Sequence, residues 1–226
     1  MTIAYNLEQV LRRIAKSVKK YRINGDQVQL VAVSKKKTYD LIKQAWEQGQ
    51  KIFGESYVQE ALGKIDDLGD CDIEWHFIGP IQSNKTAAIA AHFAWCQSVD
   101  RSKIARRLSA QRPDDMPPLN ICIQLNISSE SSKSGTDVES LWSLAEEINQ
   151  LPRVTLMGLM AIPERQEDFA SQRTAFAEMH AILAQLQARY DSVDTLSMGM
   201  SNDMEAAIAE GSTMVRVGTD IFGTRL

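Results

Sequence analysis

The sequence predicts an α/β fold, a single (β/α)8 TIM barrel over residues 1–226 with one extra helix at its N-terminus. Three observations predict it. Eight short apolar segments alternate with helical patterns, these segments are apolar on both faces, and a length of 226 residues suits one barrel domain. An open doubly wound sheet is the alternative, but no GxGxxG loop follows the first predicted strand.

The first predicted element is an amphipathic helix that precedes all the strands. Apolar residues recur at steps of three and four from Leu7 to Tyr21. Asn6 is the expected N-cap, and Gln9 stands three residues later, as in a capping box. The segment INGD at 23–26 is expected to end this helix and turn the chain.

The predicted strands are short runs rich in β-branched and aromatic residues. They span 28–34, 51–54, 73–79, 94–99, 119–127, 154–162, 193–198 and 212–218. Helical stripes lie between them, for example at 41–46, 141–148 and 176–186, and Thr38 is the expected N-cap of the helix that follows the first strand.

Composition excludes several classes of function. The net charge of -4 gives no reason to expect nucleic acid or an acidic membrane as a partner. The three cysteines form no CxxC pair, so neither a zinc site nor a disulfide framework is indicated, and no other metal is expected. The N-terminus lacks an apolar signal-peptide core, and no apolar run approaches the roughly 20 residues that cross a bilayer. We therefore expect a cytoplasmic protein.

Two turns near the C-terminus have the features of a phosphate site. The segment SMGMSND leaves the seventh strand with Gly199 for a tight turn and the hydroxyl of Ser201, and it leads into a helix. The segment RVGTD ends the eighth strand with Gly218 and Thr219. Either segment alone reads as an ordinary turn. Phosphate sites in such barrels often use the loops after strands seven and eight, so the pair together predicts phosphate binding.

A lysine follows the first strand, which neighbours the eighth strand once the barrel closes. In LVAVSKKKT, Val33 and Lys35 share the face that we assign to the barrel interior, Lys36 points the opposite way, and Lys37 stands above the rim. A ligand that spans the lysine and the phosphate turns carries a phosphate and an electrophile that an amine can capture. Pyridoxal 5'-phosphate fits, because its aldehyde forms a Schiff base with a lysine.

Arg216 lies two residues before Gly218, on the same face of the eighth strand. It is in a position to face the pyridine nitrogen of the cofactor. A guanidinium only donates hydrogen bonds, so that nitrogen would stay neutral. A neutral ring is a weaker electron sink, which disfavours chemistry that needs a strongly stabilised carbanion.

Several longer motifs resemble those of a known family. They are VAVSK, FGESYVQE, WHFIGPIQSNK, GLMAIP and SMGMSNDMEAAIAEGSTMVRVGTDIFG, which together cover most of the chain. They resemble the pyridoxal phosphate homeostasis proteins, whose barrel is similar to the N-terminal domain of alanine racemase, fold type III of the pyridoxal phosphate proteins. The resemblance implies a cofactor carrier in vitamin B6 homeostasis that buffers or delivers pyridoxal phosphate without robust turnover, with apo forms of pyridoxal phosphate-dependent enzymes as further partners.

The resemblance also implies a role for each matching residue. Lys35 would form the Schiff base and Arg216 would face the pyridine nitrogen, while Ser201, Gly218 and Thr219 would hold the phosphate with backbone help at Met200. His76 and Met160 would lie near the ring. Ser56 replaces the asparagine that is usual in FGENYVQE, which leaves a cofactor contact in doubt, and Thr38 replaces a proline.

Four alternatives stay open. The chain could be an amino-acid racemase or a related enzyme, although it ends before the C-terminal domain that supplies the second base in racemases, unless Tyr57 serves. His76 reads equally well as a core histidine. Lys133 is a surface lysine or a second cofactor-reactive amine. A monomer is favoured over an oligomer, and the recipient enzymes and the route of transfer are not predicted.

Overall fold

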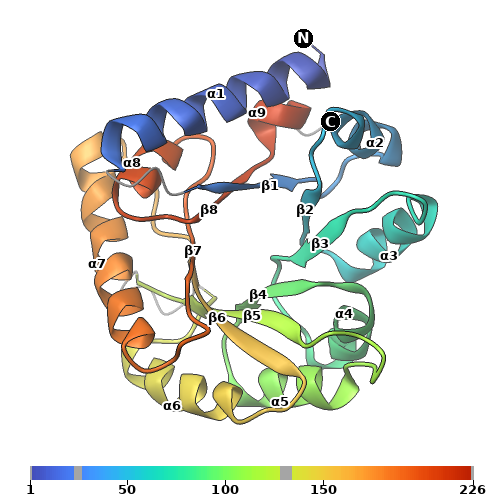
Figure 1. The fold of residues 1–226 in the computed structure, drawn as a ribbon, viewed down its shortest axis with the longest axis vertical. Coiled ribbons are helices and arrows are strands. Elements are labelled where there is room, and N and C mark those ends of the chain that lie inside the picture. Colours follow the sequence, from blue (N-terminus) through green and yellow to red (C-terminus); the bar gives the residue numbers. More distant parts are fainter. Residues whose placement is uncertain (1, 23–26, 128–133, 225–226) are drawn as a thin grey trace.

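The computed structural model describes residues 2–22, 27–127 and 134–224. Eight parallel strands close into a barrel in the order β1-β2-β3-β4-β5-β6-β7-β8, and helices surround them (Figure 1). This confirms the predicted (β/α)8 TIM barrel. The strands are β1 Gln29–Val33, β2 Ile52–Glu55, β3 Glu74–Phe77, β4 Trp95–Val99, β5 Leu119–Leu125, β6 Val154–Ala161, β7 Thr195–Ser197 and β8 Met214–Val217.

The strands agree closely with the prediction, since seven lie inside the predicted segments and β2 extends one residue further, to Glu55. A helix follows each strand. These helices are α2 Tyr39–Glu47, α3 Val58–Asp67, the short η1 Ser83–Lys85 with α4 Thr86–His92, α5 Ser102–Gln111, α6 Val138–Asn149, α7 Phe169–Gln187, α8 Met204–Ala209 and α9 Thr219–Phe222. Thr38 occupies the N-cap position of α2 as predicted, although its side chain makes no capping hydrogen bond.

The extra N-terminal helix, α1 Ile3–Tyr21, begins earlier than predicted. Its N-cap is Thr2, whose hydroxyl accepts the N–H of Tyr5 at 3.3 Å, so the assignment of Asn6 as N-cap was wrong. Both residue types cap helices well, and the buried side chain of Ile3 extends the apolar face by one more turn. Asn6 instead donates from Nδ2 to the carbonyl oxygen of Ile221 at 2.9 Å.

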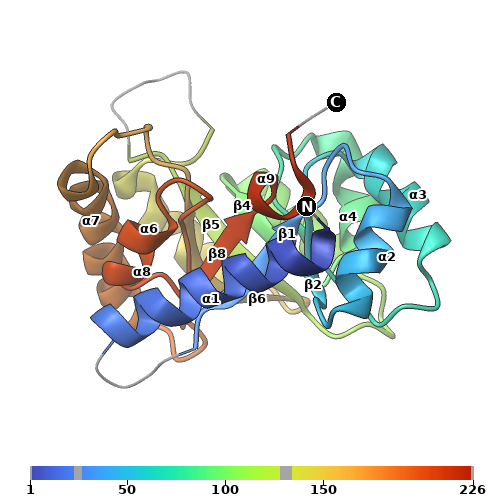
Figure 2. The same cartoon turned by 90° about the horizontal axis from the view of Figure 1, so that it is seen from above.

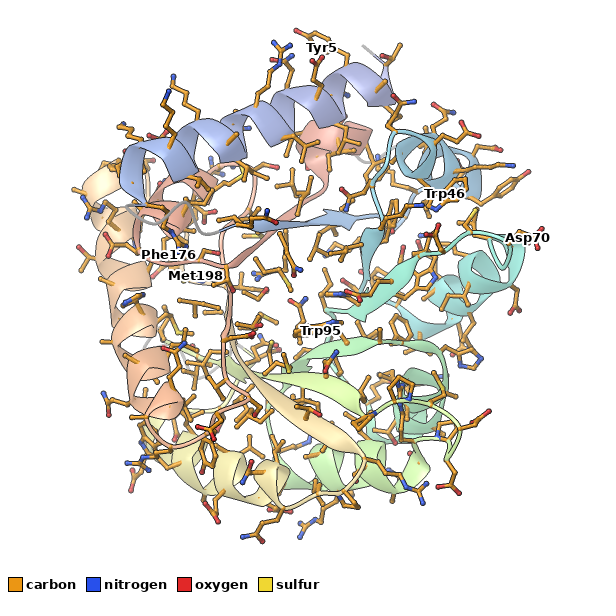
Figure 3. The ribbon with its side chains drawn as sticks, in the orientation of Figure 1. Tyr5, Trp46, Asp70, Trp95, Phe176 and Met198 are labelled. Carbon is orange, nitrogen blue, oxygen red and sulfur yellow. The ribbon has the colours of Figure 1, made fainter. Side chains whose placement is uncertain are left out.

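Two apolar clusters form the core. The larger cluster fills the space between strands and helices, and both Phe176 of α7 and Met198 belong to it (Figure 3). The smaller cluster comprises Val31, Trp95, Cys122, Met160 and Met214, which are at most 8% exposed and come from five different strands. These residues pack against one another inside the barrel, away from the segments that follow the strands.

Helix α1 completes the outer ring of helices. Both α8, with six residues, and α9, with four, are too short to cover the barrel wall where β8 meets β1. Helix α1 lies across α8 and α9 on that side and also contacts α2 (Figures 1 and 2). Within the described ranges, no helix has the length and apolar character to span a membrane.

Candidate functional site

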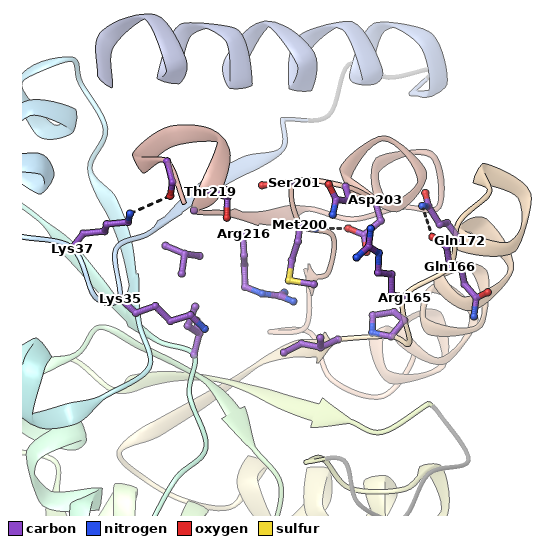
Figure 4. Close-up of a pocket in the computed structure, with 17 residues that line it drawn as sticks. Lys35, Lys37, Arg165, Gln166, Gln172, Met200, Ser201, Asp203, Arg216 and Thr219 are labelled. Atoms are coloured by element: carbon purple, nitrogen blue, oxygen red, sulfur yellow. Dashed lines mark hydrogen bonds between the residues drawn. The ribbon is translucent and has the colours of Figure 1, made fainter. Parts of the chain in front are cut away.

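A cavity of about 320 Å³ opens at the C-terminal ends of the strands. Its walls come from the segments that follow β1, β6, β7 and β8, which is the face where barrel sites lie. Six of the predicted site residues line it together, and Figure 4 shows how they surround the space. They are Lys35, Met200, Ser201, Arg216, Gly218 and Thr219.

Lys35 extends its side chain into this cavity from the end of β1 (Figure 4). The strand alternation stops directly after it, because Lys36 has a φ of 61°, a left-handed conformation. Lys36 therefore leaves the barrel, and its amine lies 5.9 Å from the ring centroid of Tyr57. The predicted separation of Lys35 from Lys36 is confirmed by these placements.

Lys37 lines the cavity as well, whereas the sequence placed it above the rim. Its Nζ donates to the carbonyl oxygens of Phe222, Gly223 and Thr224 at 3.1, 3.1 and 2.9 Å. These three carbonyls use all three donors of the ammonium group. Lys37 thus connects the segment after β1 to residues 222–224. Lys37 is two residues beyond Lys35, so strand alternation could have suggested that both side chains point to the same side.

A buried ionic network supports the backbone that carries Lys35. Lys64 of α3 donates from Nζ to the Ser34 carbonyl oxygen at 2.7 Å and to the carboxylates of Glu55 and Glu60 at 2.7 and 2.6 Å. The Ser34 hydroxyl donates to the same Glu55 oxygen at 2.6 Å. Burial raises the pKa of Glu55, while Lys64 and Ser34 oppose that rise. The network holds both the carbonyl group and the hydroxyl of Ser34 in place. It therefore fixes the position of the backbone of the next residue, Lys35.

The two predicted phosphate turns lie side by side across the cavity. Gly199 has a φ of 93°, and a Cβ there would come within 2.5 Å of the Ala207 side chain, so the turn requires glycine. The N–H of Met200 donates to the Asp203 carboxylate at 2.5 Å. Within the described part of the chain, the N–H groups of Ser201, Asn202 and Thr219 make no hydrogen bond. These donors suit an anion.

Arg216 forms the floor of the cavity. Only 4% of the residue is exposed, and its guanidinium donates to the Ser197 hydroxyl at 2.7 Å and to the Ala161 carbonyl at 2.9 Å. Burial lowers the pKa of Arg216 to about 10, and the negative charge of the Asp203 carboxylate acts in the opposite direction. The group therefore stays a cation at neutral pH, held rigidly by its two acceptors.

A chain of hydrogen bonds continues from Arg216 through the barrel interior. The Ser197 hydroxyl donates to Gln97 Oε1 at 2.6 Å, Gln97 Nε2 donates to His76 Nδ1 at 2.7 Å, and His76 Nε2 lies 2.8 Å from a Glu74 oxygen. Arg216 sets the direction of the chain, because a guanidinium cannot accept. Ser197 therefore accepts from Arg216 and donates its own O–H to Gln97 Oε1. Gln97 Nε2 then donates to His76 Nδ1, so that nitrogen carries no proton. His76 is therefore neutral, with its proton on Nε2.

Three predicted site residues do not line the cavity. His76 is fully buried within β3 and stacks on Trp95 at a centroid distance of 5.2 Å, which favours its reading as a core histidine. Burial also lowers the pKa of His76 despite the Glu74 carboxylate. Met160 belongs to the smaller apolar cluster, and Ser56 is buried where the loops after β2 and β3 pack together. Their contacts with a cofactor stay predictions.

Lys133, the candidate second reactive amine, lies outside the described residues. Among the residues that are described, no group of three histidine, cysteine or acidic side chains could hold a metal ion. Cys96 is buried, and burial raises its thiol pKa to about 12, so it is unreactive at neutral pH. Ile162, Pro163 and Arg165, which follow β6, also line the cavity, although none of them was among the predicted site residues.

Comparisons with known proteins agree with this geometry. The family model described as "Alanine racemase, N-terminal domain" matches residues 6–226. The pyridoxal phosphate homeostasis protein of Pseudomonas aeruginosa is 52% identical over 224 residues, covering 99% of this chain and 96% of the relative. The protein of the same name from Escherichia coli K12 is 50% identical over 226 residues, covering 99% and 97%.

Solved structures give the same picture. PipY of Synechococcus elongatus, 35% identical, superposes with a TM-score of 0.88 without pyridoxal phosphate and 0.87 with it bound, covering 98% of this chain and 100% of PipY in both cases. Alanine racemase of Corynebacterium glutamicum, 18% identical, shares the fold with a TM-score of 0.70 over 98% of this chain and 60% of the racemase. This chain belongs to the family of pyridoxal phosphate homeostasis proteins.

Proposed function

We propose that this protein binds pyridoxal 5'-phosphate reversibly through a Schiff base with Lys35 and takes part in the intracellular homeostasis of that cofactor. One observation carries the proposal. A single cavity brings together the amine of Lys35, the buried guanidinium of Arg216 and two turns in which the N–H groups of Ser201, Asn202 and Thr219 have no hydrogen-bond partner among the described residues. The relatives at 50–52% identity are named for pyridoxal phosphate homeostasis, and PipY has been solved with pyridoxal phosphate bound.

The residues present fit this cofactor. When bound, pyridoxal phosphate supplies an aldehyde that condenses with an amine and a ring that delocalises charge. Lys35 is the amine that reaches the cavity from β1. The N–H groups of Ser201, Asn202 and Thr219, with the hydroxyls of Ser201 and Thr219, would hold the phosphate. A side chain at position 218 would disturb the cradle, because a Cβ there would approach the Val33 carbonyl oxygen to 2.9 Å.

The position of Arg216 favours binding of the cofactor over catalysis with it. Its guanidinium is fixed by Ser197 and Ala161, and it offers only donors to whatever lies above it. A pyridine nitrogen that accepts from Arg216 remains unprotonated, which weakens the ring as an electron sink. The arginine therefore orients the ring and activates it less for chemistry at an α-carbon than a protonated pyridine nitrogen would.

A fold type III enzyme such as an amino-acid racemase is the second candidate, favoured by the shared fold. Two-base chemistry needs a second base on the far face of the ring. Tyr57, the local residue considered for that role, is 49% exposed and does not line the cavity. This placement supports a binding protein without robust turnover.

The test compares delivery with turnover. The protein loaded with pyridoxal phosphate is titrated against an apo-enzyme that depends on the cofactor, beside the same amount of free pyridoxal phosphate. We expect transfer to activate the apo-enzyme while the free aldehyde stays scarce. In parallel, the loaded protein is incubated with L-alanine in deuterated water. Exchange of the α-proton at catalytic rates would show an enzyme and contradict the proposal.

The proposal also includes cytoplasmic localisation, a monomeric state, and apo forms of pyridoxal phosphate-dependent enzymes as partners. Light scattering after gel filtration checks the monomeric state. A dimer that persists on dilution would contradict that part alone.

A further inference from the structure

Arg13 of α1 bridges the two turns that form the proposed phosphate site. Its Nη2 donates to the carbonyl oxygen of Ser201, in the turn after β7, at 2.8 Å. Its Nη1 lies 2.5 Å from the carboxylate of Asp220, which directly follows Thr219 in the turn after β8. One guanidinium therefore fixes the spacing between two segments that otherwise belong to different strand ends.

The contact with Ser201 acts on a specific donor. The carbonyl of Ser201 and the N–H of Asn202 belong to one planar trans peptide unit, so they point in opposite directions. Holding the carbonyl outward, toward α1, keeps the Asn202 N–H directed to the cavity, which Asn202 lines. A hydrogen bond to the carbonyl also polarises the peptide and strengthens its N–H as a donor.

Arg13 acts from behind the site. It does not line the cavity, and 47% of its side chain is exposed on the outer surface. Its charge is paired with Asp220, so it does not serve as a free cation for the phosphate. Its effect on a bound anion must pass through the two turns.

We propose that Arg13 is a positioning residue that sets the affinity of the site for the phosphate group of the ligand. The inference rests on the proposed function, since it assigns the turns to the phosphate of pyridoxal phosphate. It also gives the extra N-terminal helix a role: α1 lies across α8 and α9 and carries the residue that couples them (Figure 1).

Helix α1 keeps its place without Arg13. Asn6 donates to the Ile221 carbonyl at 2.9 Å, and both Lys20 and Tyr21 contact the Glu205 carboxylate, at 3.1 and 2.9 Å. The buried apolar face of α1 also remains. A substitution at Arg13 therefore removes the bridge and leaves the helix docked.

Arg12 provides a matched control on the same helix. Its guanidinium pairs with Glu8 at 2.7 Å, one turn earlier on α1, and 69% of its side chain is exposed. Arg12→Gln and Arg13→Gln make the same change in charge and side chain, but only the second removes contacts with the phosphate turns. Arg13→Lys keeps the charge and loses the two-pronged geometry.

The experiment measures the affinity of each variant for pyridoxal phosphate and for pyridoxal, which lacks the phosphate, by titrating the absorbance of the protein-bound chromophore. We expect Arg13→Gln to weaken pyridoxal phosphate binding about tenfold, equivalent to about 1.4 kcal/mol, with pyridoxal binding unchanged. Arg12→Gln should match the wild type with both ligands. Arg13→Lys should resemble Arg13→Gln.

A second readout uses the protein without cofactor. Hydrogen exchange of the peptide that contains residues 199–203 should become faster in Arg13→Gln and stay unchanged in Arg12→Gln. Equal loss for both ligands, full affinity in Arg13→Lys, or unaltered exchange would each overturn the inference. If the wild type itself binds neither ligand, the proposed function fails instead. If the wild type prefers pyridoxal phosphate and Arg13→Gln keeps that preference, only the role of Arg13 fails.

Discussion

Lys35 differs from its two lysine neighbours through backbone geometry and through its partners. The left-handed backbone at Lys36 sends that side chain out of the barrel, and three carbonyl oxygens occupy the amine of Lys37. Lys35 extends into the cavity toward Arg216, whereas Lys37 lies on the side of Thr219 (Figure 4). The left-handed conformation of a single residue, Lys36, therefore decides which lysine side chain enters the cavity toward Arg216.

Replacing Lys35 with alanine should remove the Schiff-base absorbance while the phosphate turns retain part of the affinity. The Lys36→Ala control should keep the wild-type spectrum, because Lys36 does not line the cavity. Titration with pyridoxal phosphate, followed by visible absorbance and by equilibrium dialysis, separates the two effects. A protein imine that persists in Lys35→Ala would show that another amine forms the bond.

Ser197 is the link between Arg216 and the rest of the buried hydrogen-bond chain. Ser197→Ala leaves a guanidinium donor and the Gln97 carbonyl without that partner in a fully buried place. Leaving buried polar groups unsatisfied costs about 1–3 kcal/mol, so urea unfolding should show a loss of that size. Ser143→Ala, on the exposed face of α6, should change stability by less than about 0.5 kcal/mol. Equal stability of the two variants would contradict the buried chain.

His76 should make stability depend on pH in a defined direction. Burial lowers its pKa below the ordinary 6.5, so the unfolded chain takes up this proton first as the pH falls. Stability should therefore decrease as the pH drops below about 6.5, and it should be unaffected by this group above that value. His76→Gln cannot titrate, and it also removes the hydrogen bond that lowers the pKa of Glu74, so it should lose part of the slope below about pH 6.5. The raised pKa values of Glu55 and Asp203 act with the opposite sign in both proteins and cancel in the comparison.

Among single residues, the sequence revealed those with a recognisable position. Lys35 and Thr219 stand directly after predicted strands, and Ser201 stands three residues after one, so strand order placed all three at the mouth of the barrel. His76 and Met160 do not line the cavity because they lie within β3 and β6, before the strand ends. The sequence pattern does not show which interior positions are covered by other side chains and which border the cavity. Arg13 could not be found at all, since an exposed arginine on a helix carries no periodic signal.

At the scale of elements, the ends of β1 and β2 are held by the buried charge of Lys64. The side chains of Lys64 and Glu55 are 7% and 0% exposed, and a helix pattern that expects lysine on the surface does not predict this. Such a network can fix a unique geometry at little net gain in stability.

Lys64→Met should destabilise the protein by about 3–5 kcal/mol, because it leaves Glu55 buried without its cation. The double variant Lys64→Met with Glu55→Gln removes both charges and should recover most of that loss. Urea unfolding of both single variants and the double variant gives the coupling. If the double variant were no more stable than Lys64→Met, the loss would come from packing and not from an unpaired charge.

Strand and helix positions were predictable because period and turn residues are local signals. The start of α1 was misplaced because Thr2 and Asn6 are both competent caps, and only packing of Ile3 decides between them. The residues after β6 were not predicted to line the site because Ile162, assigned to the end of the predicted strand 154–162, and Pro163 carry no polar group that indicates binding.

At the scale of the whole molecule, barrel closure brings the functional parts together. Register places Val31 of β1 beside Arg216 of β8, so residues at opposite ends of the sequence share one wall. The closed order of eight strands could be predicted by counting the alternating segments. That order also predicted that Lys35 would lie near Gly218 and Thr219. The role of α1 in closing the outer ring did not follow, because it depends on how short α8 and α9 are.

The central claim is that one lysine, at the mouth of this barrel, holds pyridoxal phosphate. The most direct measurement is borohydride reduction of the loaded protein, followed by proteolysis and mass mapping of every modified lysine. We expect the reduced cofactor on Lys35 at about one equivalent and on no other residue at comparable yield. Modification that falls mainly on Lys37, Lys133 or another amine, or a protein that takes up no label, would contradict the account.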